Sequence, residues 1–316
     1  MKGIVYKSTG SWYTVKSEAG LFYPCRIKGK FRIKGIKSTN PVAVGDVVEF
    51  ETEAQDQEEV GLITEIMDRQ NYIIRKSVKL SKQTHIIAAN IDQVFVLVTL
   101  KNPKTYTVFI DRFLATAEAY SIPAILLFNK IDECDKSELS NVEDLADIYE
   151  KINYPCLLIS AKTGIGVEEV KKMMVGKTSM FAGNSGVGKT TLINRITPEL
   201  NLKTTETSDM HMQGQHTTTF AEMYDLDFDA RIIDTPGIRG FGIVDMDADE
   251  IGDYFPELFA LKEECKFNDC LHLEEPKCAV KKALEKGQIA ESRYRSYVQM
   301  ITGEDDTYRM DIFEEK

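Results

Sequence analysis

The stretch of sequence that decides the fold runs from residue 183 to residue 191 and reads Gly183-Asn184-Ser185-Gly186-Val187-Gly188-Lys189-Thr190-Thr191. It fits the pattern G-x-x-x-x-G-K-[ST], in which glycines let successive backbone N–H groups point at phosphate oxygens. In this pattern Lys189 reaches the β- and γ-phosphates and the Thr190 hydroxyl ligates Mg²⁺. The alternative is an ordinary glycine turn before a helix. Because a short buried strand precedes the stretch and a helical pattern follows it, we interpret it as a nucleotide site.

Composition indicates a globular protein of about two domains. The chain has 316 residues, of which 43% are hydrophobic and 28% are charged. The longest apolar runs, 94–100 and 122–128, are far shorter than the roughly 18 residues of a membrane span. The first residues have no signal-peptide apolar core. These features predict a cytoplasmic protein with no membrane partner.

The charge of the chain is uneven. Its formal net charge is −11, yet residues 1–37 hold nine lysines and arginines and a single acidic residue, Glu18. A basic end on an acidic body predicts that one face meets a polyanion.

The first 68 residues predict a small β-barrel. Short alternating patterns separated by turn residues indicate strands at 3–6, 12–15, 21–27, 46–51 and 61–66. Five strands without a convincing helix suit an OB-fold-like barrel, and an SH3-like barrel is the alternative. The acidic piece 51–59 is interpreted as a solvated loop.

From about residue 70 the pattern changes to an α/β domain. Buried-strand patterns at 94–100, 124–128, 156–159, 179–182 and 231–234 alternate with helical patterns at 110–120, 137–151 and 167–175. Such alternation predicts a parallel sheet covered on both faces, with ligands at the carboxyl ends of the strands.

Two motifs at such strand ends predict guanine recognition. Asn129-Lys130-Ile131-Asp132 places a carboxylate, that of Asp132, where it can accept from the ring N–H and the exocyclic amine of guanine. Adenine offers no such donor pair. The stem of Lys130 would pack on the base, and Asn129 would tie this loop to the phosphate loop. Ser160-Ala161-Lys162 follows the next strand, where a backbone amide could meet the guanine oxygen.

Two further motifs predict the Mg²⁺ and γ-phosphate contacts. Asp234 ends a strand pattern and opens Asp234-Thr235-Pro236-Gly237, so it can hold Mg²⁺ through water while the Gly237 amide senses the γ-phosphate. Among Thr217, Thr218 and Thr219 we favour Thr218 as the threonine that closes on Mg²⁺.

The order of these motifs is unusual. The guanine-recognition motifs precede the phosphate loop and the Mg²⁺ acid, whereas in Ras-like proteins they come last. The sequence therefore predicts a circularly permuted GTPase.

A cysteine cluster predicts a metal centre in a third, small module with helical patterns at 281–287 and 291–301. Three of the six cysteines lie with one histidine within 14 residues, as Cys265, Cys270, His272 and Cys278. Three thiolates and an imidazole form a closed set for one tetrahedral, structural Zn²⁺.

With an OB-type barrel, a permuted GTPase and a Cys₃His module, the whole chain resembles the RsgA family, ribosome small subunit-dependent GTPase A. The resemblance implies three domains: a barrel at 1–68, the GTPase at 69–242 and an α-helical zinc-binding domain at 243–316. It implies a GTP hydrolase, with GTP and GDP as ligands, that acts in late maturation of the small ribosomal subunit and contacts its rRNA. We expect a monomer.

The resemblance also implies a role for His216. Ras-like proteins keep a catalytic glutamine after the D-x-x-G motif, where this chain has Ile238. An aliphatic side chain cannot orient water, and His216 is the substitute that the family suggests, beside Lys189 and Thr218 in catalysis. Two alternatives stay open. One is a nucleotide-gated rRNA-binding scaffold with little turnover, and the other is a P-loop kinase, which the guanine motif disfavours.

Overall fold

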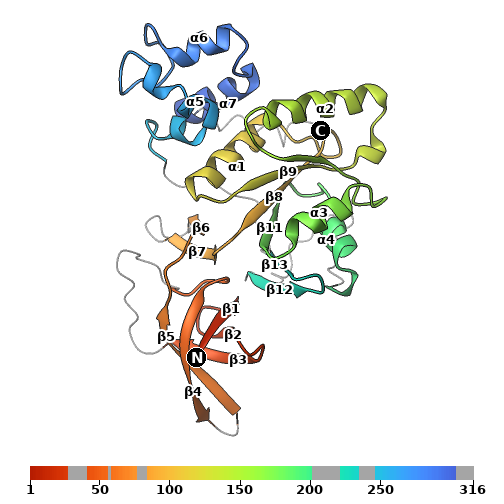
Figure 1. Cartoon of the computed structure of the whole chain (residues 1–316), viewed down its shortest axis with the longest axis vertical. Coiled ribbons are helices and arrows are strands. Elements are labelled where there is room, and N and C mark those ends of the chain that lie inside the picture. Colours follow the sequence, from red (N-terminus) through yellow and green to blue (C-terminus); the bar gives the residue numbers. More distant parts are fainter. Residues whose placement is uncertain (28–40, 56–57, 77–83, 201–220, 235–245, 304–316) are drawn as a thin grey trace, which may run out of the picture.

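The computed structural model describes residues 1–27, 41–55, 58–76, 84–200, 221–234 and 246–303. Figure 1 shows three parts along the long axis of the molecule: a β-barrel, a sheet with helices on both faces, and a small helical module. Among the described helices, every one falls short of the length and hydropathy that crossing a bilayer requires.

The N-terminal part is a closed barrel. Its strands are β1 (Lys2–Ser8), β2 (Tyr13–Ser17), β3 (Phe22–Ile27), β4 (Val47–Gln55) and β5 (Glu58–Ile66). They pair in the order β1-β2-β3-β5-β4, and β4 pairs again with β1, which closes the ring. The β3–β5 pairing is parallel and the others are antiparallel. This arrangement fits a five-stranded OB-type barrel and confirms the predicted fold class of this part.

Alternation along the strands fills the barrel. Tyr13 and Val15 point inward from β2 and join a core completed by Val5, Cys25, Val42, Val48, Phe50 and Ile63. Gly61 faces Cys25 across the β3–β5 pairing, and a Cβ there would lie 2.3 Å from the Cys25 sulfur. Only glycine fits this position of β5.

The prediction of a solvated acidic loop at 51–59 was wrong. Strand β4 continues to Gln55 and β5 begins at Glu58, so most of this piece is paired backbone, with Glu53 opposite Val60. Glu51, Thr52 and Glu53 are exposed. The end of β4 and the start of β5 extend beyond the barrel core. Their exposed side chains do not show the apolar alternation by which strands are recognised in a sequence.

The central sheet places the phosphate loop in its middle. Its strands are β8 (Gln93–Val98), β9 (Ala124–Phe128), β10 (Cys156–Leu158), β11 (Thr178–Ala182), β12 (Glu222–Leu226) and β13 (Ala230–Asp234). They lie in the order β10-β9-β8-β11-β13-β12. The strand that leads into the phosphate loop, β11, therefore has β8 and β13 as neighbours, although β8 lies far earlier in the chain.

Helices cover both faces of this sheet (Figure 1). The helices are α1 (Thr107–Ala119), α2 (Lys136–Glu150), α3 (Val167–Met174) and α4 (Lys189–Ile196). Val94, Val96 and Val98 of β8 pack with α1 and α2, whereas Phe95 and Leu97 pack with α3 and α4. This two-sided burial explains why the strand reads as one continuous apolar run.

The sheet is mixed rather than parallel, which corrects the prediction. Strands β8, β9, β10, β11 and β13 are parallel, but β12 runs antiparallel to β13. Only residues 227–229 join these two strands, and so short a connection allows only antiparallel pairing. Sequence analysis also missed a separate hairpin, β6 (Tyr72–Lys76) and β7 (Thr84–Ala89), between the barrel and β8.

The C-terminal module packs on α1. Its helices are α5 (Pro256–Phe259), α6 (Ala279–Glu285) and α7 (Glu291–Thr302), of which the last two match the predicted helical patterns within two residues. Ala115 of α1 belongs to the apolar core of this module, together with Phe255 and Tyr297. The module and helix α1 of the GTPase domain therefore share one apolar core.

Candidate nucleotide site and metal centre

The predicted nucleotide motifs meet at one edge of the central sheet. Because β9, β10, β11 and β13 are parallel, their carboxyl ends lie along the same edge. Asn129 follows β9, Ser160 comes shortly after β10, Gly183 follows β11, and Asp234 is the last residue of β13. Motifs spread over about a hundred residues of sequence thus form one site.

The phosphate loop curls around its own lysine. Lys189, the first residue of α4, donates from Nζ to the carbonyl oxygens of Gly183 and Asn184 at 2.5 and 2.8 Å. Val187 is fully buried and anchors the loop in the core beneath α3 and α4. Ser185 and Gly186 stay exposed at the rim. The loop therefore holds a cation at the N-terminus of a helix, which is where a phosphate binds.

Asn129 links three motifs. Its Nδ2 donates to the Val187 carbonyl at 2.8 Å, and its Oδ1 accepts from the Ala161 amide at 2.9 Å. Gly188 packs directly against it, and a Cβ on Gly188 would lie 2.3 Å from the Asn129 Nδ2. Gly188 also has a φ of +102°, which L side chains rarely adopt. The guanine motif and the phosphate loop are therefore fixed relative to each other through a single amide side chain.

Asp132 is positioned by the next motif. It lies in the 3₁₀ turn Ile131–Glu133, with its carboxylate exposed, and accepts from the Ser160 hydroxyl at 2.6 Å. Ser160 is itself fully buried and accepts from the Thr163 amide at 3.0 Å. Lys162 is exposed. One carboxylate oxygen is thus held in place, and the exposed carboxylate can receive donors from a base.

Sequence analysis missed one wall of the site, the loop 99–105 at the carboxyl end of β8. The Asn102 carbonyl accepts from the Lys130 Nζ. Lys101 pairs with Glu138 of α2 at 2.6 Å, and Pro103 would contact a Cβ built on Gly186. Its position after the carboxyl end of a parallel strand could have indicated this loop, but the loop has no recognisable sequence motif.

The remaining predicted residues divide into two groups. Thr190 and Thr191 lie in the first turn of α4, and Asp234 lies opposite Glu222 at the end of β13. His216, Thr218 and Gly237 fall outside the described residues.

The four predicted metal ligands converge. One ligand atom from each of Cys265, Cys270, His272 and Cys278 lies within 4.8 Å of all the others. His272 Nδ1 is 3.4 Å from the Cys278 sulfur and 3.6 Å from that of Cys265, and these two sulfurs are 3.9 Å apart. Ligands at about 2.3 Å from a tetrahedral ion would be separated by about 3.8 Å, so the residues fit a metal.

The surroundings of these ligands also suit a cation. Burial raises the pKa of the Cys270 thiol to about 12 and lowers the pKa of His272, so burial favours the uncharged form of both ligands and a bound cation would have to displace the thiol proton. Amide hydrogens of Ala279 and Lys281 point at the sulfurs of Cys265 and Cys278. The group can therefore hold a metal that favours sulfur and nitrogen ligands.

Comparison with known proteins decides the family. A model described as RsgA GTPase matches residues 66–244, and one described as RsgA N-terminal domain matches residues 2–63. The chain belongs to the RsgA GTPase family. It is 65% identical to a Small ribosomal subunit biogenesis GTPase RsgA from Christiangramia forsetii, over 99% of this chain and 100% of that protein. A protein of the same name from Flavobacterium johnsoniae is 63% identical, over 100% of this chain and 97% of the relative.

Solved structures of similar proteins agree. The crystal structure of YjeQ from Thermotoga maritima matches with a TM-score of 0.78 and 37% identity, covering 96% of this chain and 97% of that one. YloQ, described as a circularly permuted GTPase, matches with a TM-score of 0.75 and 30% identity, covering 97% and 95%. As an RsgA family member with this motif order, the chain is a GTP hydrolase with a circularly permuted GTPase domain.

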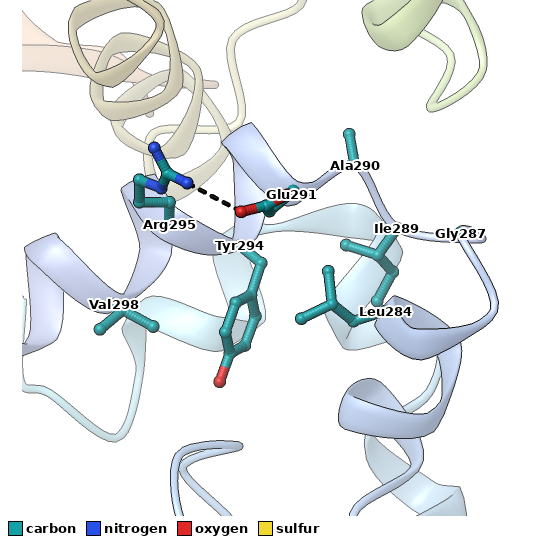
Figure 2. A pocket seen from close by; sticks show the side chains of 8 residues that line it. All are labelled: Leu284, Gly287, Ile289, Ala290, Glu291, Tyr294, Arg295 and Val298. Atoms are coloured by element: carbon teal, nitrogen blue, oxygen red, sulfur yellow. Dashed lines mark hydrogen bonds and ion pairs between the residues drawn. The ribbon is translucent and has the colours of Figure 1, made fainter.

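A pocket of about 700 Å³ lies away from the nucleotide motifs, between α6 and α7. Figure 2 shows Leu284 and Ile289 on one side of it and Tyr294 and Val298 on the other, with the Glu291–Arg295 ion pair at its rim. The Tyr294 hydroxyl donates to the His272 carbonyl at 2.7 Å. That bond connects a wall of the pocket to the backbone of the Cys₃His group.

Proposed function

We propose that this RsgA family GTPase hydrolyses GTP to GDP and phosphate on the small ribosomal subunit, during its late maturation. The observation that carries the proposal is the full-length match to relatives named for small ribosomal subunit biogenesis, at 65% identity over 99% of the chain. A match that covers the barrel and the metal module as well as the GTPase domain supports a shared role rather than a shared fold alone.

Guanine selection is assigned to the edge formed by the two motifs after β9 and β10. Asp132 receives two donors of the base while Ser160 holds its carboxylate, and Lys130 packs its stem along the ring. The loop of Ala161 and Lys162 would contribute a backbone amide to the guanine oxygen, while in this structure the Ala161 amide donates to Asn129. Support comes from the hydrogen bonds of Asn129, which join this edge to the phosphate loop.

Phosphate binding is assigned to residues 183–191. The Lys189 Nζ, which donates to the Gly183 and Asn184 carbonyls in this structure, would donate to phosphate oxygens when a nucleotide binds. Thr190, Thr218 and Asp234, the last through water, would hold Mg²⁺, which neutralises charge on the transferring phosphoryl group. The Gly237 amide would contact the γ-phosphate.

Water activation is assigned to His216. The chain has Ile238 where a glutamine would orient the attacking water, and an imidazole nitrogen can accept a hydrogen bond from that water. Both residues lie outside the described ranges, so this assignment rests on the sequence and the family.

The metal held by the Cys₃His group is proposed to be one structural Zn²⁺. A complete set of four protein ligands leaves no open position for a substrate, and thiolates with an imidazole are typical zinc ligands. The metal would supply much of the folding free energy of the small module.

The proposed division of labour has three parts. Residues 1–68 would contact rRNA, 69–242 would bind and hydrolyse GTP, and 243–316 would form the zinc domain. The two family models support the first boundary, because they meet between residues 63 and 66. We further propose that the chain works in the cytoplasm as a monomer.

The proposal is tested by sedimentation of the full chain with purified small ribosomal subunits in the presence of GDP or a non-hydrolysable GTP analogue. We expect co-sedimentation with the analogue and weaker association with GDP. Large ribosomal subunits serve as the control. Equal association in both nucleotide states, with no turnover of GTP, would instead indicate an rRNA-binding scaffold.

A further inference from the structure

The outer surface of β2 and β3 carries two aromatic and two basic side chains, with Thr14 and Pro24 between them. Inward-facing Tyr13 and Val15 alternate with outward-facing neighbours, and the same holds across the ladder, where Tyr13 pairs with Cys25. The outward set, called the β2–β3 stripe below, consists of Trp12, Thr14, Lys16, Phe22, Pro24 and Arg26.

At one end of the stripe an arginine lies on an indole. The Arg26 guanidinium carbon is 3.8 Å from the centre of the Trp12 ring, the closest cation–ring contact found among the described residues. Trp12 remains 38% exposed, and Arg26 is exposed as well. The guanidinium can cover only one face of the indole, so exposed aromatic surface is left beside a positive charge.

The backbone around Trp12 is held in place. The carbonyl of Trp12 accepts from the Thr9 amide at 2.9 Å and from the Thr9 hydroxyl at 3.1 Å, and the Tyr13 hydroxyl donates to the Gly10 carbonyl at 3.2 Å. The ring therefore extends from a tight turn, and little conformational freedom would be lost when a ligand stacks on it.

Apart from Arg26, the cationic side chains in the described residues of the barrel are already paired with acids. Lys2, Lys7 and Lys16 form ion pairs with Glu49, Glu222 and Asp225, respectively. Among the described residues no carboxylate pairs with Arg26, whose charge remains available for a phosphate. The Lys16–Asp225 pair also marks where the stripe reaches β12 of the GTPase sheet.

We propose that Trp12 and Arg26 form a stacking site for unpaired nucleobases of single-stranded RNA. The inference rests on the proposed rRNA contact and specifies the site and the kind of RNA. A base would stack on the exposed indole face while the guanidinium, held against the other face, pairs with a neighbouring phosphate. Duplex RNA offers no free base face for this contact, so the site selects unpaired segments.

The test measures the intrinsic tryptophan fluorescence of the full chain. Trp12 is the only tryptophan, so intrinsic tryptophan fluorescence reports this site alone. The full chain is titrated with an oligoadenylate of about ten nucleotides, a length within the range of one OB-type site, and with a duplex of equal length. We expect saturable quenching by the single strand and little by the duplex. Equal quenching by both would overturn the inference.

Variants then measure affinity for the same oligoadenylate carrying a fluorescent label. We expect Trp12→Ala to weaken binding about tenfold, because stacking on one aromatic side chain is lost, and Trp12→Phe to recover most of it. Arg26→Ala should weaken binding as well. The control is Tyr106→Ala on the GTPase domain, which removes a ring that is 40% exposed and lies under Lys104, and it should leave the affinity unchanged.

The outcomes separate this inference from the proposed function. If the wild-type chain sediments with small subunits but Trp12→Ala leaves oligoadenylate affinity unchanged, the stacking site does not exist and the proposed function stands. The same holds if Trp12→Ala lowers subunit binding alone, since the surface would then contact a ribosomal protein. If oligoadenylate binds through Trp12 but no subunit sediments with the chain, the proposed function fails and the stacking site remains.

Discussion

Asn129 shows how much of the nucleotide site depends on one side chain. It is 5% exposed, donates to the phosphate loop and accepts from the loop that follows β10. An amide can donate from its nitrogen and accept at its oxygen, whereas the carboxylate of the same shape lacks the donor at neutral pH. Asn129 therefore positions the phosphate loop and the loop after β10 relative to each other.

Base selection makes the first prediction. Asp132→Asn replaces an acceptor carboxylate with an amide that presents a donor, which leaves a guanine donor unpaired at a cost of about 1–3 kcal/mol. We expect GTP affinity to fall by roughly tenfold or more while xanthosine triphosphate becomes a ligand, measured by direct titration. Glu133→Gln, which removes the neighbouring exposed charge, is the control and should bind GTP normally. Unchanged GTP affinity in Asp132→Asn would contradict the assignment.

The metal centre makes the second prediction. Cys270→Ser should lose most of the bound zinc and unfold the segment around residues 265–278, because a buried four-ligand site is removed. Nucleotide affinity should be largely retained, since the nucleotide motifs lie on the sheet. Metal analysis and nucleotide titration measure the two effects. Cys156→Ser, a cysteine of β10 outside the cluster, should keep its metal, and a wild-type chain without zinc would exclude the zinc assignment.

The residues that sequence reasoning identified are those with a recognisable local pattern. The phosphate loop, the guanine motif and the Cys₃His spacing each occupy fewer than fifteen consecutive residues, so they are visible without a fold. Asn102 contributes only a backbone carbonyl to Lys130, so its side chain gives the sequence no signal of this contact. Its role depends on the approach of two strand ends, which no local pattern encodes.

At the scale of elements, helix α7 is held against α1 by a buried ion-pair network. Arg293 of α7 is 1% exposed and donates to Asp111 of α1 at 2.8 Å and to Glu257 of α5 at 2.7 Å. The Tyr149 hydroxyl of α2 also donates to Asp111, at 2.9 Å. Helices α1 and α2 of the GTPase domain and α5 and α7 of the metal module thus meet in one buried network.

This network makes the third prediction. Arg293→Met leaves the carboxylates of Asp111 and Glu257 buried without their cation, which costs about 3–5 kcal/mol. Chemical denaturation should show this loss, and adding Asp111→Asn should recover part of it because an uncompensated charge is removed. Arg295→Met on the same helix is the control, since its pair with Glu291 is exposed and should contribute less than about 1 kcal/mol. Equal stability of the two arginine variants would show that the network does not hold the module.

Elements with buried faces were predicted best. The ends of β9 agree with the structure, and those of α2, α3 and α7 differ from it by one residue at most, because apolar periodicity marks them clearly. The ribbon at the end of β4 and β5 was missed because its side chains face solvent. The β6–β7 hairpin was missed because it lies between two domains and its two strands have no strong alternating pattern.

At the scale of the whole molecule, the three parts contact one another through side chains as well as being joined by linkers. The barrel meets β12 where the Tyr6 hydroxyl and Lys16 contact Asp225 at 2.6 and 2.5 Å. Burial alone would raise the pKa of Asp225, but the hydrogen bonds from Lys16 and Tyr6 outweigh it and the pKa is lowered. These contacts therefore stabilise the junction above the unfolded pKa of an aspartate and weaken as the pH falls through the lowered value.

The fourth prediction concerns the basic charge of the N-terminal segment. If the N-terminal segment meets rRNA phosphates, association with small subunits should weaken steeply as salt is added. Neutralising Arg26, Lys28, Lys30 and Arg32 together should flatten the slope, because fewer counterions are released. A variant that neutralises four lysines in or directly after helices α2 and α3 of the GTPase domain, Lys136, Lys151, Lys171 and Lys172, should keep the wild-type slope. An identical slope in both variants would move the RNA contact elsewhere.

We propose that this circularly permuted GTPase hydrolyses GTP faster when it is bound to the small ribosomal subunit. The most direct test of this proposal is the steady-state rate of GTP hydrolysis by the full chain with and without purified small subunits, using Lys189→Ala to remove the phosphate-loop cation. We expect small subunits to raise the wild-type rate by an order of magnitude or more and to leave the variant inactive. A wild-type rate that small subunits do not change would contradict the account.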